Sequence, residues 1–148
     1  MMRSVPASGV YEKGRLDLGD VINAVLGLVG DGSVGAVSFF LGVTKKAGRG
    51  KRDVMLLEME SYVEHANKAL SKICEETKEK YGLTFVGIWH LIGRFELGEP
   101  IVLVAVAGVS REGVFQGLRE AVERYKREPA LFKKEVYVDG SYTWLEGA

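Results

Sequence analysis

Two kinds of apolar periodicity alternate along this chain, and their order constrains the fold more than any other feature. Some segments carry apolar side chains at every second position or in short β-branched runs, which is typical of strands. Others repeat them every three or four positions, which predicts helices. The predicted strands are residues 54–61, 83–92, 101–109 and 131–138, and the predicted helices are residues 62–81 and 111–128. From Val54 to Val138 the order is therefore β-α-β-β-α-β, the order of a split βαβ, ferredoxin-like unit.

Further elements flank this unit on both sides. Residues 1–16 show no periodicity and are expected to form an extended arm. Asp17 is a suitable N-cap for the helix predicted to follow it. The apolar segment 34–43 is predicted to be a buried strand paired with residues 54–61, and residues 142–145 a last short strand.

Composition agrees with one globular domain over residues 1–148. The fold class expected is α+β, with three helices packed on a mostly antiparallel sheet. No window approaches the roughly 20 apolar residues of a membrane-spanning helix, and no signal peptide is visible. The one cysteine, Cys74, fits a reducing compartment, so the cytoplasm is the expected location. The 20 basic and 20 acidic residues balance, which argues against nucleic acid or a membrane as a partner.

The basic residues are nevertheless clustered, and the segment from Lys126 to Lys133 is the most informative. Lys126 lies in the last predicted turn of a helix, Pro129 reverses the chain, and Lys133 follows near the start of a strand. Such a return could bring both ammonium groups to one pocket. Neighbouring positive charge there lowers the pKa of a lysine and suits it to act as a base or nucleophile. Spacing alone favours a simpler interpretation, in which these charges complement the helix dipole and face solvent.

Other candidate residues are less informative. The glycine-rich basic loop 44–53 could wrap an anion or be an ordinary charged connection, whereas Arg111 behind Ser110 at a helix start makes a better anion site. Cys74 lies on an apolar helix face and is expected to be a buried, inert thiol. His90 ends an apolar strand, where a structural role is at least as expected as a catalytic one. One cysteine and two distant histidines predict no metal site, and no cofactor motif is present.

Several short motifs occur in an order that matches a known family. They are Gly35–Val43, Leu57–Tyr62, His90–Glu99, Ser110–Glu112 with Phe115, Lys126–Glu135, Gly140 and Trp144. Each is weak alone, but their order and spacing together are specific. From about Leu16 to Leu145 the chain resembles the large, catalytic subunit of molybdopterin synthase, the MoaE family. The resemblance implies an α/β-hammerhead-type fold and a homodimer with a small ubiquitin-like subunit at each outer end, a heterotetramer.

The resemblance also implies the chemistry. The small partner's C-terminal Gly-Gly tail carries a thiocarboxylate into the large subunit's pocket, and two sulfur atoms pass to cyclic pyranopterin monophosphate to make the molybdopterin dithiolene. This makes the chain a sulfurtransferase, with Lys126 and Lys133 on the two active-site lysines and Arg111 on the arginine that binds the anionic substrate. Two expected substrate contacts depart from the family. Ser110 replaces a histidine, and Lys45 replaces an arginine and loses its bidentate fork.

A rival function stays open on the sequence: a non-catalytic, regulatory module that binds an anionic ligand on a ferredoxin-like scaffold. An RNA-binding split βαβ domain is disfavoured by the zero net charge and by the lack of an aromatic RNA-binding motif.

Overall fold

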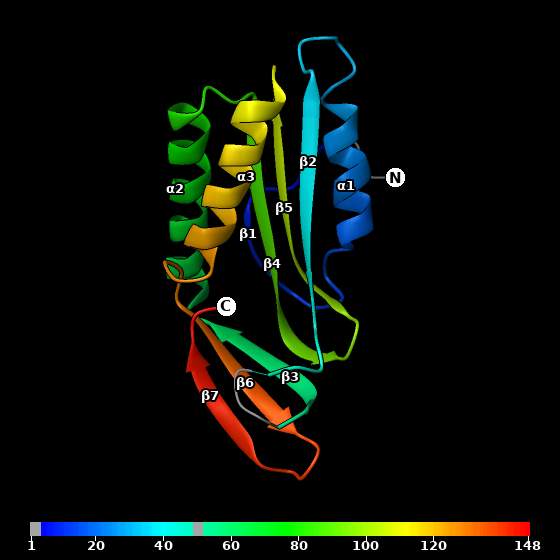
Figure 1. The fold of residues 1–148 in the computed structure, drawn as a ribbon, viewed down its shortest axis with the longest axis vertical. Helices are drawn as coiled ribbons and strands as arrows, with labels where there is room; N and C mark the ends of the chain where they lie inside the picture. The colour runs from blue at the N-terminus through cyan, green and yellow to red at the C-terminus, as the bar shows by residue number, and fades with distance from the viewer. Residues whose placement is uncertain (1–3, 49–51) are drawn as a thin grey trace.

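The computed structural model describes residues 4–48 and 52–148, and in them ten elements follow one another (Figure 1). They are β1 (Gly9–Glu12), α1 (Leu18–Gly27), β2 (Ala36–Val43), β3 (Val54–Ser61), α2 (Val63–Lys80), β4 (Phe85–Glu96), β5 (Pro100–Gly108), α3 (Arg111–Tyr125), β6 (Leu131–Tyr137) and β7 (Tyr142–Glu146). From β3 to β6 the order is the predicted β-α-β-β-α-β series. The predicted α+β class, with three helices and a mostly antiparallel sheet, is confirmed.

One long strand, β4, connects the two ends of the sheet. The strand order is β2-β5-β4-β3-β6-β7, with β1 added in parallel along β4. The first half of β4, Phe85–His90, pairs with β5, and its second half, Gly93–Glu96, pairs with β3. Gly93 has a φ of 127°, a left-handed conformation that glycine adopts at little cost. The strand therefore changes partner at a residue suited to an abrupt turn of the backbone.

The pairing predicted between residues 34–43 and 54–61 is wrong. β2 pairs with β5, whereas β3 pairs with β4 on one side and with β6 on the other. The connection between β2 and β3 is too long to fix a hairpin register, and it leads from the upper strands of Figure 1 to the lower group of β3, β6 and β7. β2 is also less buried than expected, since its side chains are only partly covered.

The helices cover both faces of the upper strands. α2 and α3 lie side by side against β4, β5 and β2, and α1 packs on the opposite face against β5 (Figure 1). Asp17 caps α1 as predicted, because its carboxylate accepts a hydrogen bond from the backbone N–H of Asp20 at 3.1 Å. Ser110 occupies the N-cap of α3, but its side chain makes no capping hydrogen bond. None of the helices in the described ranges is both long and apolar enough to cross a bilayer.

The core lies between these helices and the central strands. Its largest fully buried side chains include Trp89, Phe95, Leu70 and Ile73. Cys74 belongs to the same cluster, and burial raises the pKa of its thiol to about 11. The thiol is therefore buried and protonated at neutral pH, as the sequence predicted.

Candidate functional site

A cavity of about 280 Å³ lies between the ends of β2, β4 and β5 and the strands β3 and β6. Its walls come from the end of β2 and the loop behind it, from β3, β4, β5 and β6, and from the C-terminal end of α3. Its polar and charged lining residues are Thr44, Lys45, His90, Tyr125, Lys126, Lys133 and Glu135. Apolar side chains complete the lining.

The two lysines reach this cavity by the predicted reversal of the chain. Lys126 is the C-cap of α3, a turn follows it, and β6 begins at Leu131 after the buried Pro129. Successive side chains of a strand point to opposite faces. Lys133 lines the cavity, whereas the ammonium group of its neighbour Lys134 lies 4.3 Å from the ring centroid of Tyr142 on β7. Alternation along β6 therefore selects Lys133 for the cavity.

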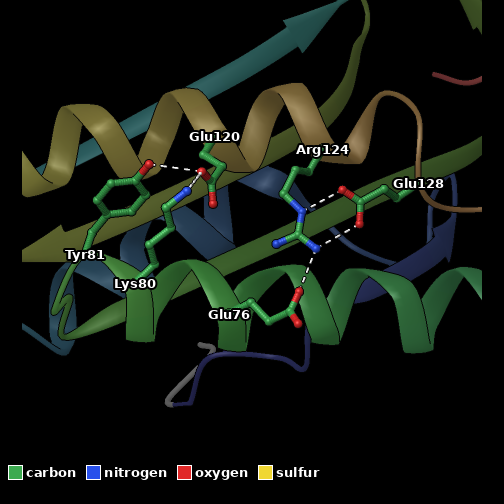
Figure 2. Close-up of polar contacts among 6 residues, drawn as sticks. All are labelled: Glu76, Lys80, Tyr81, Glu120, Arg124 and Glu128. Atoms are coloured by element: carbon green, nitrogen blue, oxygen red, sulfur yellow. Dashed lines mark hydrogen bonds and ion pairs between the residues drawn. The ribbon is translucent and has the colours of Figure 1, made fainter.

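A network of ion pairs fixes the end of α3 that carries Lys126 (Figure 2). The guanidinium of Arg124 donates to both carboxylate oxygens of Glu128, at 2.6 and 2.8 Å, and to Glu76 on α2 at 2.7 Å. These hydrogen bonds raise the pKa of Arg124 and lower that of Glu128. One turn earlier, Glu120 accepts from Lys80 at 2.7 Å. Bidentate pairing of this kind holds planar groups in one geometry, so the turn after α3 starts from a fixed position.

Three buried polar side chains form the inner surface of the cavity. His90 is 1% exposed; burial, followed by the charges of Lys133 and Lys126, lowers its pKa to about 4, although a hydrogen bond to the Leu91 carbonyl acts in the opposite direction. The ring of Tyr125 meets it edge-on at a centroid distance of 5.8 Å, and burial raises the pKa of the Tyr125 phenol. Glu135 is 4% exposed and accepts a hydrogen bond from the hydroxyl of Tyr137 at 3.1 Å.

Two of these three groups were not singled out from the sequence. Glu135 follows Lys133 by two positions, so strand alternation could have placed it on the same face. Tyr125 ends the apolar repeat of its helix, a pattern that predicts packing and not chemistry. His90 was recognised as a structural or catalytic candidate, and the structure places it on the cavity.

The predicted site residues fall into two places. The structure brings Lys45, Lys126 and Lys133 together on the cavity. Ser110 and Arg111 are exposed at the opposite end of α3. A helix of 15 residues is about 22 Å long, so within one chain neither residue reaches the lysines.

The arrangement suits the binding and proton chemistry of anions. Three lysine side chains surround a cavity with an apolar lining, where charge pairs are stronger than in water. Buried polar groups offer both kinds of partner, a phenolic donor and an imidazole acceptor. In residues 4–48 and 52–148, no three His, Cys, Asp or Glu side chains gather in a way that could hold a metal ion.

Comparison with known proteins agrees with the ordered motifs. The sequence model of a family described as MoaE protein matches residues 12–128. The chain is 34% identical over 127 residues to a molybdopterin synthase catalytic subunit from Culex quinquefasciatus, which covers 85% of this chain and 78% of that protein. It is 32% identical over 126 residues to the subunit of that name from Pyrococcus abyssi, covering 85% and 84%.

Solved structures share the fold. The crystal structure of molybdopterin synthase from Staphylococcus aureus superposes with a TM-score of 0.80 at 25% identity, covering 93% of this chain and 96% of that one. A complex of subunits 1 and 2 of molybdopterin-converting factor from Helicobacter pylori contains a chain with the same fold, with a TM-score of 0.70 at 15% identity. The chain belongs to the MoaE protein family, and the resemblance carried by its ordered motifs is thereby confirmed.

Proposed function

We propose that this protein is the catalytic subunit of molybdopterin synthase, a sulfurtransferase of molybdenum cofactor biosynthesis that acts in the cytoplasm. Family membership supports the reaction class. The observation that carries the proposal is the cavity itself, because Lys126 from the end of α3 and Lys133 from β6 line the same space. The simpler interpretation, charges that complement the helix dipole, covers Lys126, which is exposed at the C-cap of α3, but it does not cover Lys133, which is half-buried on β6.

The sulfur donor is a partner protein. No cysteine lines the cavity, and Cys74 is buried elsewhere as a protonated thiol, so sulfur has to be brought in. A small ubiquitin-like subunit with a C-terminal Gly-Gly thiocarboxylate meets this need. Its slender tail fits a cavity of about 280 Å³, and its anionic end suits the ammonium groups.

The second reactant, cyclic pyranopterin monophosphate, is also anionic. In each transfer the thiocarboxylate sulfur forms a bond to a side-chain carbon of the pterin while a carbon–oxygen bond at that carbon breaks. In one transfer the leaving oxygen is that of the cyclic phosphate, which opens, and in the other the oxygen leaves as water. Water then cleaves each acyl–sulfur bond and leaves a carboxylate on the tail, so that two transfers give the dithiolene. Lys126 and Lys133 neutralise the approaching anions and move protons in these steps, and Lys45 at the rim binds phosphate.

Ser110 and Arg111 take part in this scheme through a second copy of the chain. Since α3 separates them from the lysines of their own chain by about 22 Å, they contact substrate only if a homodimer brings them to the pocket of the other protomer. The active species is then a homodimer with a small subunit on each protomer.

The test is formation of molybdopterin by the purified protein with a thiocarboxylated small subunit and the cyclic pterin. We expect Lys126→Ala and Lys133→Ala each to abolish most of the activity while the fold is retained. Lys134→Ala is the matched control, because that side chain is adjacent in sequence but points to the other face of β6. A regulatory module would bind the pterin without turnover. Full activity of both pocket variants would refute the proposed mechanism.

A further inference from the structure

His90 is the most deeply buried titratable group of the cavity. It lies on β4 and is 1% exposed, yet it lines the cavity together with Lys126 and Lys133. The Tyr125 ring packs edge-on against it at 5.8 Å and limits its rotation. A side chain held in this way presents one fixed edge to whatever enters the cavity.

The hydrogen bond of His90 determines which ring nitrogen carries the proton. Nδ1 lies 2.8 Å from the carbonyl oxygen of Leu91. A carbonyl oxygen only accepts, so Nδ1 is the N–H donor and Nε2 has a lone pair. Nε2 has no hydrogen-bond partner in the described part of the chain. The one fully buried side-chain atom there without a partner is Thr77 Oγ1. Nε2 is therefore accessible from the cavity.

The surroundings keep this imidazole uncharged. Burial and the charges of Lys133 and Lys126, Lys133 acting more strongly, lower the pKa of His90 to about 4. The other ionisable groups on the cavity are the buried phenol of Tyr125, Glu135 with its bond from Tyr137, and Lys45 at the rim. At neutral pH, Nε2 is thus a hydrogen-bond acceptor without charge.

We propose that His90 is a positioning residue of the lysine pocket: when the partner's tail is bound, its Nε2 accepts a hydrogen bond from the ammonium group of Lys133 and directs that group at the tail. A neutral imidazole orients the ammonium group without adding a negative charge to the pocket. The inference rests on the proposed sulfur transfer and names a residue that serves it.

Two substitutions separate the two nitrogens. In His90→Asn the amide lies near the position of Nδ1, so the bond to Leu91 can persist while the acceptor in the cavity is lost. In His90→Gln the amide reaches the position of Nε2 and can offer its oxygen there. We expect His90→Asn to lower kcat by about tenfold to a hundredfold with little change in KM, as for a misplaced reacting group. His90→Gln is expected to recover most of kcat.

The outcomes are distinct. Wild-type kcat in His90→Asn overturns the inference, and so does an equal loss in both variants that parallels their loss of stability in urea, because that pattern indicates a structural role. A second readout needs no turnover: with the small subunit bound, the nitrogen resonance of Nε2 should report an accepted hydrogen bond in the wild-type protein and no such bond in Lys133→Met. If the wild-type protein makes no product, the proposed function fails. An unchanged Nε2 resonance in Lys133→Met refutes the role of His90 independently.

Discussion

The buried, uncharged state of His90 predicts a measurable dependence of stability on pH. An ordinary histidine has a pKa near 6.5, and in the folded protein the pKa of His90 is lowered to about 4. Between pH 6.5 and pH 4, His90 is therefore protonated in the unfolded chain and unprotonated in the folded chain. The folded state keeps its full stability above pH 6.5 and loses it progressively as the pH falls towards 4.

The size of the effect follows from the same two values. One pKa unit corresponds to about 1.4 kcal/mol, and pH 5.0 lies about 1.5 units below the unfolded-state pKa, so the cost there is about 2 kcal/mol. His90→Gln removes the titrating group. Between pH 7.5 and 5.0 the wild-type protein should lose about 2 kcal/mol more unfolding free energy than the variant. In urea this is a difference of about 1 M in the midpoint shift.

Urea unfolding of both proteins at the two pH values is the assay. His65 and the carboxylates are present in both chains, so their contributions cancel in the comparison. His90→Gln also changes the unfolding free energy by an amount that does not depend on pH. The informative quantity is therefore the change in unfolding free energy between the two pH values, compared between the two proteins. Parallel loss of stability in the two proteins would show that His90 is not held neutral, and the argument for Nε2 as an uncharged acceptor would fall with it.

Two further predictions concern other parts of the molecule. A Cβ at Gly87 would lie 2.3 Å from Cη2 of the fully buried Trp89, so Gly87→Ala should lower the free energy of unfolding by about 1–3 kcal/mol. The control is Gly27→Ala in α1, where the new Cβ has open space around it and should raise the free energy of unfolding by up to about 1 kcal/mol. Thermal unfolding of the two variants and the wild-type protein makes the comparison. If Arg111 acts in the pocket of a second copy, a refolded equal mixture of Arg111→Ala and Lys126→Ala chains should regain about a quarter of the wild-type activity, since half of the dimers then have one intact pocket; a mixture that stays inactive would place Arg111 outside the reaction.

Most elements could be predicted from the sequence because each carries its own local signal. Period and capping identified the helices, and Asp17 caps α1 as expected. Strand pairing has no such signal when the connection is long, and for this reason residues 34–43 were paired with the wrong strand. The extension of β4 through Gly93 to Glu96 was missed as well, since glycine in a polar segment predicts a turn, whereas here it marks a change of partner.

The candidate site was predictable to a similar degree. A proline between a helix end and a strand start implies a reversal, and this reversal places Lys126 and Lys133 on one cavity. The inner surface was not predictable, because His90 comes from a strand more than 30 positions earlier and meets the lysines only through the sheet. The distance between Arg111 and the lysines follows from helix length alone. Whether Arg111 contacts the substrate depends on how a second chain is arranged, and the residues of one chain carry no local signal for that arrangement.

The continuity of β4 has a consequence for how the pocket opens and closes. Because one strand belongs to both halves of the sheet, the cavity walls are not separate bodies joined by a loose tether. Backbone amides from Phe85 to Glu96 that bond to other strands should therefore exchange with deuterium at one common, slow rate, as a single cooperative unit. Entry of a ligand then has to proceed through movement at the rim and not through separation of the two halves.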